Sequence, residues 1–319
     1  MSAARVLMVY RALGLGDFLT GVPAYRALAN AFPHHRRLLV APAALRPLVP
    51  LAGVFDELLA ADPLAPVPDV GPVDVAVNLH GRGPESHRAV LARSPARLIA
   101  FEHTHVPESR GMPVWRPREH EVSRWCRLLC ESGIPADRGD LGLDTPRLST
   151  YRALAGAVVI HPGAASQARR WPPESFASVA AELALRGHTV VVTGGPDERD
   201  LADRIADRAR LPHTSVLAGR TTLLELALLV AHARLVVCGD TGVGHLATAL
   251  STPSVVLFGP VSPAEWGPPP GGPHRAIWAG GRGDPHGNVP YRGLLRINVT
   301  DVLAAIDGLE RAGASGRVA

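Results

Sequence analysis

Short, continuous runs of apolar and β-branched residues recur along this 319-residue chain and alternate with stretches of helical periodicity. Polar and apolar residues do not alternate within the runs, which predicts strands buried on both faces, as in a parallel sheet. Strands that alternate with helices in this way predict an α/β fold. We expect strands at residues 6–10, 38–41, 73–79, 98–101, 157–160, 189–193, 235–238 and 254–258, and helices at 23–31, 174–186, 222–231 and 302–311.

The strand–helix series restarts after a stretch rich in Asp, Gly and Pro at residues 137–149. We therefore predict a linker near residues 144–154 and two domains, 1–150 and 151–319, each a Rossmann-like, doubly wound parallel sheet. Such sheets bind ligands at the carboxyl ends of their strands, so two facing domains would enclose a central cleft. The final helix, 302–311, could pack back on the N-terminal domain.

Two smaller local patterns complete this outline of the fold. Residues 268–288 are dense in Gly and Pro and are predicted to form a loop. Thr222 and Glu225 are spaced as a capping box, which predicts the start of a helix.

Composition and charge restrict the class of function. The chain is 46% hydrophobic and 19% charged, as expected of a globular protein. The formal net charge of +4 does not indicate a nucleic-acid partner and suits a small anionic ligand as well. The sequence contains no lysine, and all 33 basic residues are arginine. Any phosphate contact is therefore expected to use arginine, which can bind phosphate in a bidentate manner.

Targeting and metal signals are weak. No run of about 18 apolar residues predicts a transmembrane helix, and the N-terminus lacks the pattern of a signal peptide, so we expect a cytoplasmic protein. Cys126, Cys130 and Cys238 lack further ligands nearby and are interpreted as buried free thiols. No metal site and no cofactor is predicted.

The glycine-rich turn at residues 239–245, Gly-Asp-Thr-Gly-Val-Gly-His, joins a predicted strand to a predicted helix. Glycines let backbone amides approach an anion, and the start of a helix provides N–H groups without partners and a favourable dipole. Thr241 could add a hydroxyl donor, and His245 falls in the first helical turn. An ordinary strand–helix turn that needs glycine only for its geometry is the alternative.

A carboxylate follows the first predicted strand, at Asp17. The surrounding glycines do not form the dinucleotide-binding pattern GxGxxG, because Leu19 occupies the last position of that pattern. A carboxylate at the carboxyl end of a strand could act as a general base on an acceptor hydroxyl. The alternative is that Asp17 caps the helix that follows.

Further candidates follow the first two strands of the second half. Arg169 and Arg170 could reach a phosphate, or they could be solvated surface residues. Glu198 could accept hydrogen bonds from ribose hydroxyls, or it could be an acid that favours the start of a helix.

Three ordered motifs resemble glycosyltransferase family 9, the ADP-heptose:lipopolysaccharide heptosyltransferase family. They are residues 14–28 (GLGDFLTGVPAYRAL), 159–172 (which contains IHPGAASQARRWP) and 239–263 (GDTGVGHLATALSTPSVVLFGPVSP). Residues 120–125 (HEVSRW) are similar to the family's helix that precedes the interdomain linker.

The resemblance implies a GT-B fold and an inverting transfer of a sugar, heptose, from a nucleotide diphosphate donor, ADP-heptose. It implies that Asp17 is the catalytic base and that Arg169 replaces a phosphate-contacting lysine. Glu198 matches a carboxylate that contacts the adenosine ribose. The donor-binding residues would also include Gly16, Asp240, Thr241, Gly242, Val243, Gly244 and His245.

The sequence departs from the family at Val243-Gly244, where a bulkier pair is usual, and matches it weakly in the N-terminal half beyond Asp17. That half normally recognises the acceptor, for which Asn78, His80 and Arg82 are our candidates. The acceptor could be a glycan, a lipid-linked molecule or a natural product, with peripheral membrane contact left open. A GT-B-fold sugar-nucleotide epimerase and a non-catalytic sugar-nucleotide-binding protein remain as alternatives.

Overall fold

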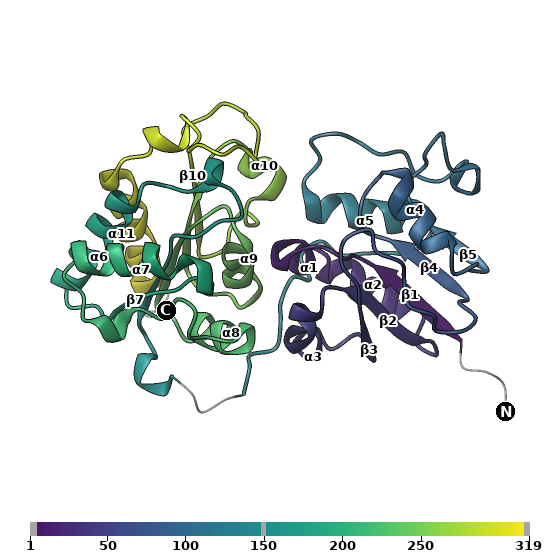
Figure 1. Cartoon of the computed structure of the whole chain (residues 1–319), viewed down its shortest axis with the longest axis horizontal. Helices are drawn as coiled ribbons and strands as arrows, with labels where there is room; N and C mark the ends of the chain where they lie inside the picture. Colours follow the sequence, from purple (N-terminus) through teal and green to yellow (C-terminus); the bar gives the residue numbers. More distant parts are fainter. Residues whose placement is uncertain (1–4, 148–150, 316–319) are drawn as a thin grey trace. The chain divides into compact units, whose positions relative to one another are not determined.

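The computed structural model describes residues 5–147 and 151–315. The chain divides by its internal contacts into two compact units, Met1–Asp144 and Thr145–Ala319, and we describe each by itself (Figure 1). Residues 148–150, within the predicted linker and at the predicted boundary between residues 150 and 151, lie outside the described residues.

The first unit contains a five-stranded, wholly parallel sheet in the order β3-β2-β1-β4-β5. The order reverses between β1 and β4, where Tyr10 lies level with both Val40 and Asn78. A doubly wound sheet binds ligands at such a switch point. The elements are β1 (Val6–Tyr10), α1 (Leu15–Thr20), α2 (Val22–Ala31), β2 (Arg36–Ala41), α3 (Val49–Ala52), β3 (Glu57–Ala60), β4 (Val75–Asn78), α4 (Pro84–Leu91), β5 (Arg97–Ile99) and α5 (Glu121–Glu131).

The second unit repeats this plan, with strands in the order β10-β9-β8-β6-β7, all parallel. In Figure 1, α6, α7 and α11 lie on one side of this sheet and α8 and α9 on the other. The elements are β6 (Val158–His161), α6 (Pro173–Leu185), β7 (Val190–Val192), α7 (Arg199–Arg208), α8 (Leu223–Ala231), β8 (Leu235–Gly239), α9 (Gly242–Ala249), β9 (Ser254–Phe258), α10 (Pro263–Trp266), β10 (His274–Trp278) and α11 (Val299–Ser315).

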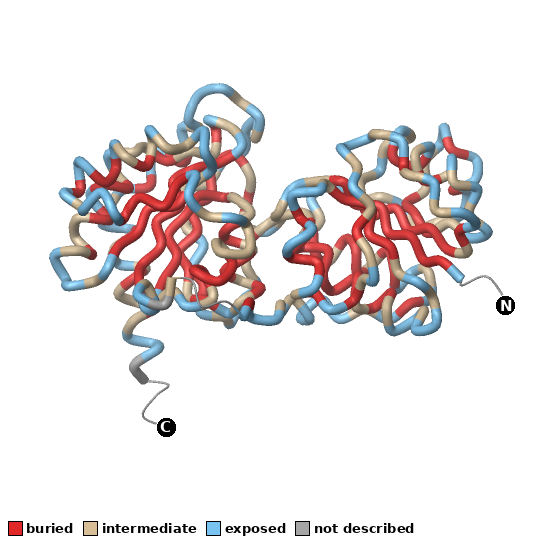
Figure 2. Tube along the Cα trace, turned by 60° about the horizontal axis from the view of Figure 1, so that its bottom comes forward, coloured by how far each residue is buried: buried red, intermediate tan, exposed pale blue. Residues whose placement is uncertain are grey.

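The core of each unit lies on its sheet. Every residue of β1, β4, β6, β8 and β9 is buried, and Figure 2 shows the buried residues gathered in the strands of both units. This pattern confirms the prediction of parallel strands covered on both faces. The predicted capping box is also present: Glu225 N donates to Thr222 Oγ1 at 3.2 Å, and Thr222 N donates to the Glu225 carboxylate at 2.8 Å. Such a cap contributes about 1 kcal/mol.

Two strands escaped prediction. β10 lies inside the stretch 268–288, which is therefore not one continuous loop. Both β3 and β10 are at sheet edges, and their partly exposed residues do not form the continuous apolar run that identifies a central strand. The final helix, α11, is longer than predicted and packs on α6, β9 and β10 of its own unit. Of the cysteines, Cys126 and Cys238 are buried, but Cys130 faces solvent from α5.

Candidate functional site

The second unit places the predicted donor turn between β8 and α9. Asp240 follows directly after β8 and is held by a hydrogen bond from its N–H to Leu257 O at 3.0 Å. Thr241 is the N-cap of α9, and its hydroxyl makes no capping hydrogen bond to the helix. Because the first N–H groups of a helix have no partner within it, the start of α9 can bind an anion.

Arg169 lies at this turn, on the short 3-10 helix η4 (Gln167–Arg169) that follows β6. Its Nη1 donates to the carbonyl oxygen of Asp240 at 3.5 Å, and its buried Nε has no hydrogen-bond partner among the described residues. A buried guanidinium N–H without a partner is costly, so this group is suited to an anionic ligand. The structure thus brings together two predicted site residues that are 71 positions apart in sequence.

The carboxyl group of Asp240 is almost wholly buried, with 5% of the residue exposed. Burial raises its pKa from 3.8 to about 6, and the charge of Arg169 opposes this rise. A buried carboxylate destabilises the folded protein unless a ligand or another group donates hydrogen bonds to it. It is suited to accept hydrogen bonds from hydroxyl groups of a ligand.

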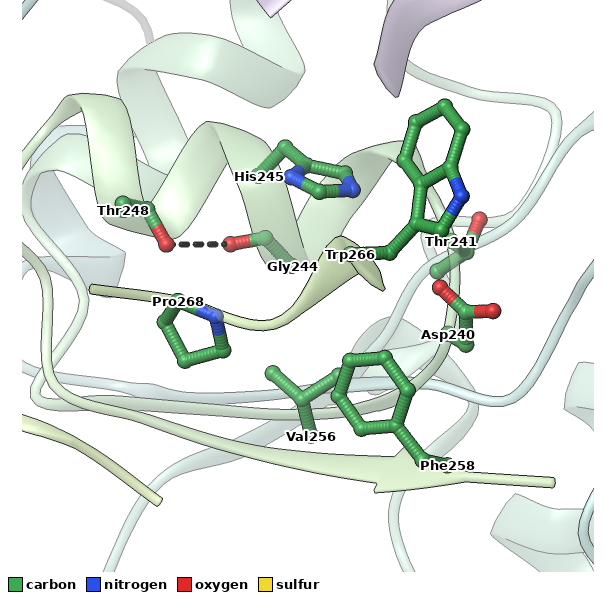
Figure 3. A pocket seen from close by; sticks show the side chains of 9 residues that line it. All are labelled: Asp240, Thr241, Gly244, His245, Thr248, Val256, Phe258, Trp266 and Pro268. Carbon is green, nitrogen blue, oxygen red and sulfur yellow. Dashed lines mark hydrogen bonds between the residues drawn. The ribbon is translucent and has the colours of Figure 1, made fainter. Parts of the chain in front are cut away.

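A pocket lies beside this turn, under the first turns of α9 (Figure 3). The ring of Trp266 stands edge-on to the ring of His245, with their centroids 5.8 Å apart. The lining side chains are Asp240, Thr241, Gly244, His245, Thr248, Val256, Phe258, Trp266 and Pro268. Trp266 was not identified from the sequence as part of this pocket. Trp266 follows three residues after the motif 239–263, and its place beside His245 depends on the short helix α10.

Val243 and Gly244, the pair predicted to depart from the family pattern, face the interior of the unit. Val243 is buried. A Cβ atom on Gly244 would lie 3.3 Å from Val256 Cγ2 and 3.4 Å from Cys238 Sγ, which is tighter than most such contacts. Glycine therefore lets α9 lie close on β8 and β9, and a bulkier residue would shift the helix.

Glu198 lies at the carboxyl ends of β6 and β7. Its carboxylate folds over Gly163, where a Cβ atom would be only 2.0 Å from Glu198 Oε1. It also accepts a hydrogen bond from Gly195 N at 2.9 Å and lies 3.6 Å from Arg170 Nη2. The residue thus stabilises the start of a helical segment, and 17% of its side chain remains exposed.

In the first unit, Asp17 lies in the first turn of α1, just after the carboxyl end of β1. The N-cap of that helix is Gly14, which has no side chain, and the Asp17 carboxyl hydrogen-bonds to the backbone of Gly14, so Asp17 also helps to cap the helix. The Asp17 side chain is 27% exposed, and Oδ1 lies 3.6 Å from Nη2 of the buried Arg11. Burial raises the pKa of this carboxyl, and the charge of Arg11 opposes the rise. The adjacent Gly16 uses its carbonyl oxygen to accept a hydrogen bond from Thr20 Oγ1.

The three acceptor candidates lie at the end of β4, the strand next to β1, and in the loop after it. Asn78 is fully buried: its Nδ2 donates to Ser86 Oγ, and its Oδ1 accepts from His80 N, each at 3.0 Å. Its amide therefore fixes the loop between β4 and α4. His80 is half-buried and stacks on Tyr10 with ring centroids 4.9 Å apart. Burial, with the charge of Arg11, lowers its pKa to about 4, so it is neutral near pH 7. Arg82 is exposed.

Neither metal ligands nor membrane-spanning helices were found in the described part of the chain. No group of three or more His, Cys, Asp or Glu residues there could hold a metal ion. No helix in residues 5–147 and 151–315 is both long and apolar enough to cross a membrane.

Comparison with known proteins adds to this geometry. The sequence profile of glycosyltransferase family 9 (heptosyltransferase) matches residues 100–280, more than half of the chain. Lipopolysaccharide heptosyltransferase 3 of Escherichia coli is 35% identical over 165 residues, which are 50% of this chain and 48% of that protein. Lipopolysaccharide heptosyltransferase 1 of Pseudomonas aeruginosa is 35% identical over 153 residues, 47% of this chain and 42% of that protein. The matches thus span about half the length of these curated relatives or less.

Solved structures resemble the chain over nearly its whole length. The ADP-heptose lipopolysaccharide heptosyltransferase II of Escherichia coli has a TM-score of 0.73 at 22% identity and covers 95% of this chain and 98% of its own. The family 9 glycosyltransferase of Veillonella parvula has a TM-score of 0.79 at 21% identity, covering 96% and 97%. This likeness confirms the predicted GT-B fold of two Rossmann-like units. On the evidence of the sequence profile, the chain belongs to glycosyltransferase family 9, the heptosyltransferase family.

Proposed function

We propose that this chain is an inverting glycosyltransferase that moves a heptose from ADP-heptose to a hydroxyl group of an acceptor. The observation that carries the proposal is the arrangement at Asp240. There the Nε of Arg169, which has no partner in the described part of the chain, and the start of α9 form a site suited to a diphosphate. The names of the relatives and of the structural neighbour support ADP-heptose as the donor and a lipopolysaccharide precursor as the acceptor.

The proposed reaction is a single displacement. The acceptor oxygen forms a bond to the anomeric carbon as the bond from that carbon to the diphosphate oxygen breaks, and ADP leaves with the electron pair. The acceptor proton passes to the carboxylate of Asp17. Arg169 and the N–H groups of α9 stabilise the charge that develops on the leaving diphosphate.

The other residues have supporting roles in this proposal. Asp240 and the turn through His245 hold the donor, with Asp240 accepting hydrogen bonds from sugar hydroxyls. Glu198 accepts from the ribose. His80 and Arg82 contact the acceptor, while Asn78 shapes the loop that carries them. Gly16 is a further donor contact in this proposal. We propose that the protein is cytoplasmic, as expected from the sequence.

The experiment measures donor binding and transfer with the same protein. Calorimetry with ADP-heptose, GDP-mannose and UDP-glucose should give measurable binding for ADP-heptose alone. Incubation with ADP-heptose and lipopolysaccharide that lacks heptose should release ADP and add one heptose to the acceptor, seen by mass spectrometry. An isomerised donor formed without acceptor would instead indicate an epimerase. Donor binding with no turnover would indicate a binding protein, and either result would contradict the proposal.

Two variants locate the base. Asp17→Asn should lower the rate of transfer by roughly 10²–10⁴-fold, while the affinity for ADP-heptose stays unchanged. Glu85→Gln is the matched control, because Glu85 is also a first-turn acid of a helix that follows a central strand of the same sheet. Glu85→Gln should keep full transfer. Normal transfer by Asp17→Asn would remove Asp17 from the mechanism.

A further inference from the structure

Arg11 is the most heavily bonded buried charge in the first unit. Its side chain is fully buried between α1, the end of β4 and α5. Nε donates to the carbonyl oxygen of Asp17, and Nη1 donates to that of Leu79. Nη2 donates to Thr20 Oγ1 and to Glu121 Oε1, each at 3.1 Å. The guanidinium therefore fixes the turn that carries Asp17 against two other elements.

The same Nη2 atom lies between two carboxylates. Glu121 Oε1 is 3.1 Å away and is hydrogen-bonded, whereas Asp17 Oδ1 is 3.6 Å away, beyond a normal charge-assisted hydrogen bond. Arg11 thus holds the backbone of Asp17 closely but its carboxylate only loosely. Backbone hydrogen bonds from Gly14 and Asp17 also reach this carboxylate, and 27% of the side chain remains accessible.

Glu121 is itself held firmly in place. Its side chain is 7% exposed, and its Oε1 also accepts from Trp125 Nε1 at 2.8 Å, while Oε2 pairs with Arg124. The ring of Trp125 lies under the guanidinium of Arg11, 4.8 Å from Cζ to the ring centroid. A carboxylate bound by two arginines and an indole cannot easily leave Arg11.

From this geometry we propose that Glu121 is a positioning residue. It occupies Nη2 of Arg11 and so keeps the guanidinium from closing on the Asp17 carboxylate, which stays free to take the acceptor proton. This inference deepens the proposed function and rests on Asp17 acting there as the base. Without the charge of Glu121, Arg11 would be a buried cation whose nearest carboxylate is Asp17, and the 3.6 Å ion pair between them would close to a direct hydrogen bond.

The charges around Asp17 agree with this role. Arg11 lowers the pKa of Asp17, and Glu121 raises it. Tyr25 also faces the pair, but burial raises the pKa of its hydroxyl, which stays neutral. Loss of the Glu121 charge should therefore make Asp17 a weaker base, and loss of the Arg124 charge beyond it should have the opposite effect. The titratable and charged groups that face the cluster are Arg11, Asp17, Tyr25, His80, Glu121 and Arg124.

The test is a titration of the Asp17 carboxyl by NMR, using the full chain labelled at aspartate carboxyl carbons. The signal is assigned by its loss in Asp17→Asn. Glu121→Gln keeps the shape and the acceptor oxygen but removes the charge, and it should move the Asp17 midpoint to lower pH. Arg124→Gln should move it to higher pH. Glu119→Gln is the matched control and should leave it unchanged, since Glu119 forms a comparable ion pair, with Arg127, on the same part of the chain.

Kinetics give the second readout. Glu121→Gln should lower kcat about tenfold and move the acid limb of the kcat profile to lower pH, with the KM for ADP-heptose unchanged. Glu121→Asp, which keeps the charge, should restore part of kcat. If Glu121→Gln does not fold, Arg124→Gln still tests the sign of the charge effect on Asp17.

The possible failures are distinguishable. An Asp17 midpoint that is unchanged or raised in folded Glu121→Gln, or lowered in Arg124→Gln, would overturn the role of Glu121. Normal transfer by Asp17→Asn would overturn the base itself, whatever the titration shows. Equal loss of kcat at every pH in Glu121→Gln and Glu121→Asp would indicate a purely structural role.

Discussion

Asp240→Asn should make the protein more stable and a poorer binder of donor. The carboxyl group lies almost entirely out of water, and burial raises its pKa from 3.8 to about 6 despite the nearby charge of Arg169. The folded protein therefore holds a charge that would be better solvated in the unfolded chain. A neutral amide of the same shape removes that penalty, but it also removes the proposed acceptor of hydrogen bonds from the donor sugar.

The size of the stability gain in Asp240→Asn follows from the pKa of Asp240. A displacement of about two pH units, at about 1.4 kcal/mol for each, makes the ionised carboxylate destabilising by about 3 kcal/mol. Below pH 3.8 the group is protonated in both states, and the variant gains nothing. Between 3.8 and about 6 the unfolded chain ionises first, so wild-type stability falls as pH rises. Above about pH 6 the variant has its full gain in stability over the wild type.

Scanning calorimetry at pH 3.5, 5 and 7.5 measures the difference in melting temperature between the variant and the wild type. At pH 7.5, Asp240→Asn should raise the melting temperature of the second unit by roughly 6–12 °C, with a smaller gain at pH 5 and almost none at pH 3.5. Affinity for ADP-heptose should fall roughly ten- to hundredfold. Asp203→Asn is the control, since Asp203 forms only a surface ion pair with Arg199. A destabilised variant, or a gain independent of pH, would refute the reasoning.

Substitutions at three further positions address the proposed donor site of the second unit. Gly163→Ala should displace the Glu198 carboxylate, because the new Cβ would lie 2.0 Å from Oε1, and should weaken ADP-heptose binding in calorimetry; unchanged affinity would remove Glu198 from the site. Arg169→Ala should lower kcat by at least about a hundredfold, whereas Arg169→Lys should keep most of it; equal rates in both variants would contradict a phosphate contact. Trp266→Ala should lower donor affinity about tenfold with little change in melting temperature, and a large loss of stability would instead make the ring structural.

The fold could largely be predicted from sequence because its central strands are buried on both faces. Continuous apolar runs at β1, β8 and β9 identify such strands directly. Of the edge strands, β5 and β7 were predicted, but β3 and β10 could not be found in this way. One of their faces or ends meets solvent, so their sequences are mixed and resemble loops.

The contacts within the candidate donor site could be predicted to a similar extent. The rule that ligands bind at the carboxyl ends of parallel strands predicts that Arg169 and Asp240 meet, and they do. The contact between Arg11 and Glu121 could not be predicted. These residues are 110 positions apart, and no local pattern states which buried arginine pairs with which carboxylate. Asn78 shows the same limit: a polar residue at a strand end can make all of its hydrogen bonds within the protein and leave none for a ligand.

The central claim is a direct displacement in which Asp17 takes the proton and the second unit retains the diphosphate. The configuration of the anomeric carbon in the product tests it most directly. ADP-heptose of defined configuration would be transferred to lipopolysaccharide lacking heptose, and NMR would give the configuration of the new linkage. A single displacement predicts an inverted anomeric centre. A retained configuration would require two displacements and would contradict the mechanism.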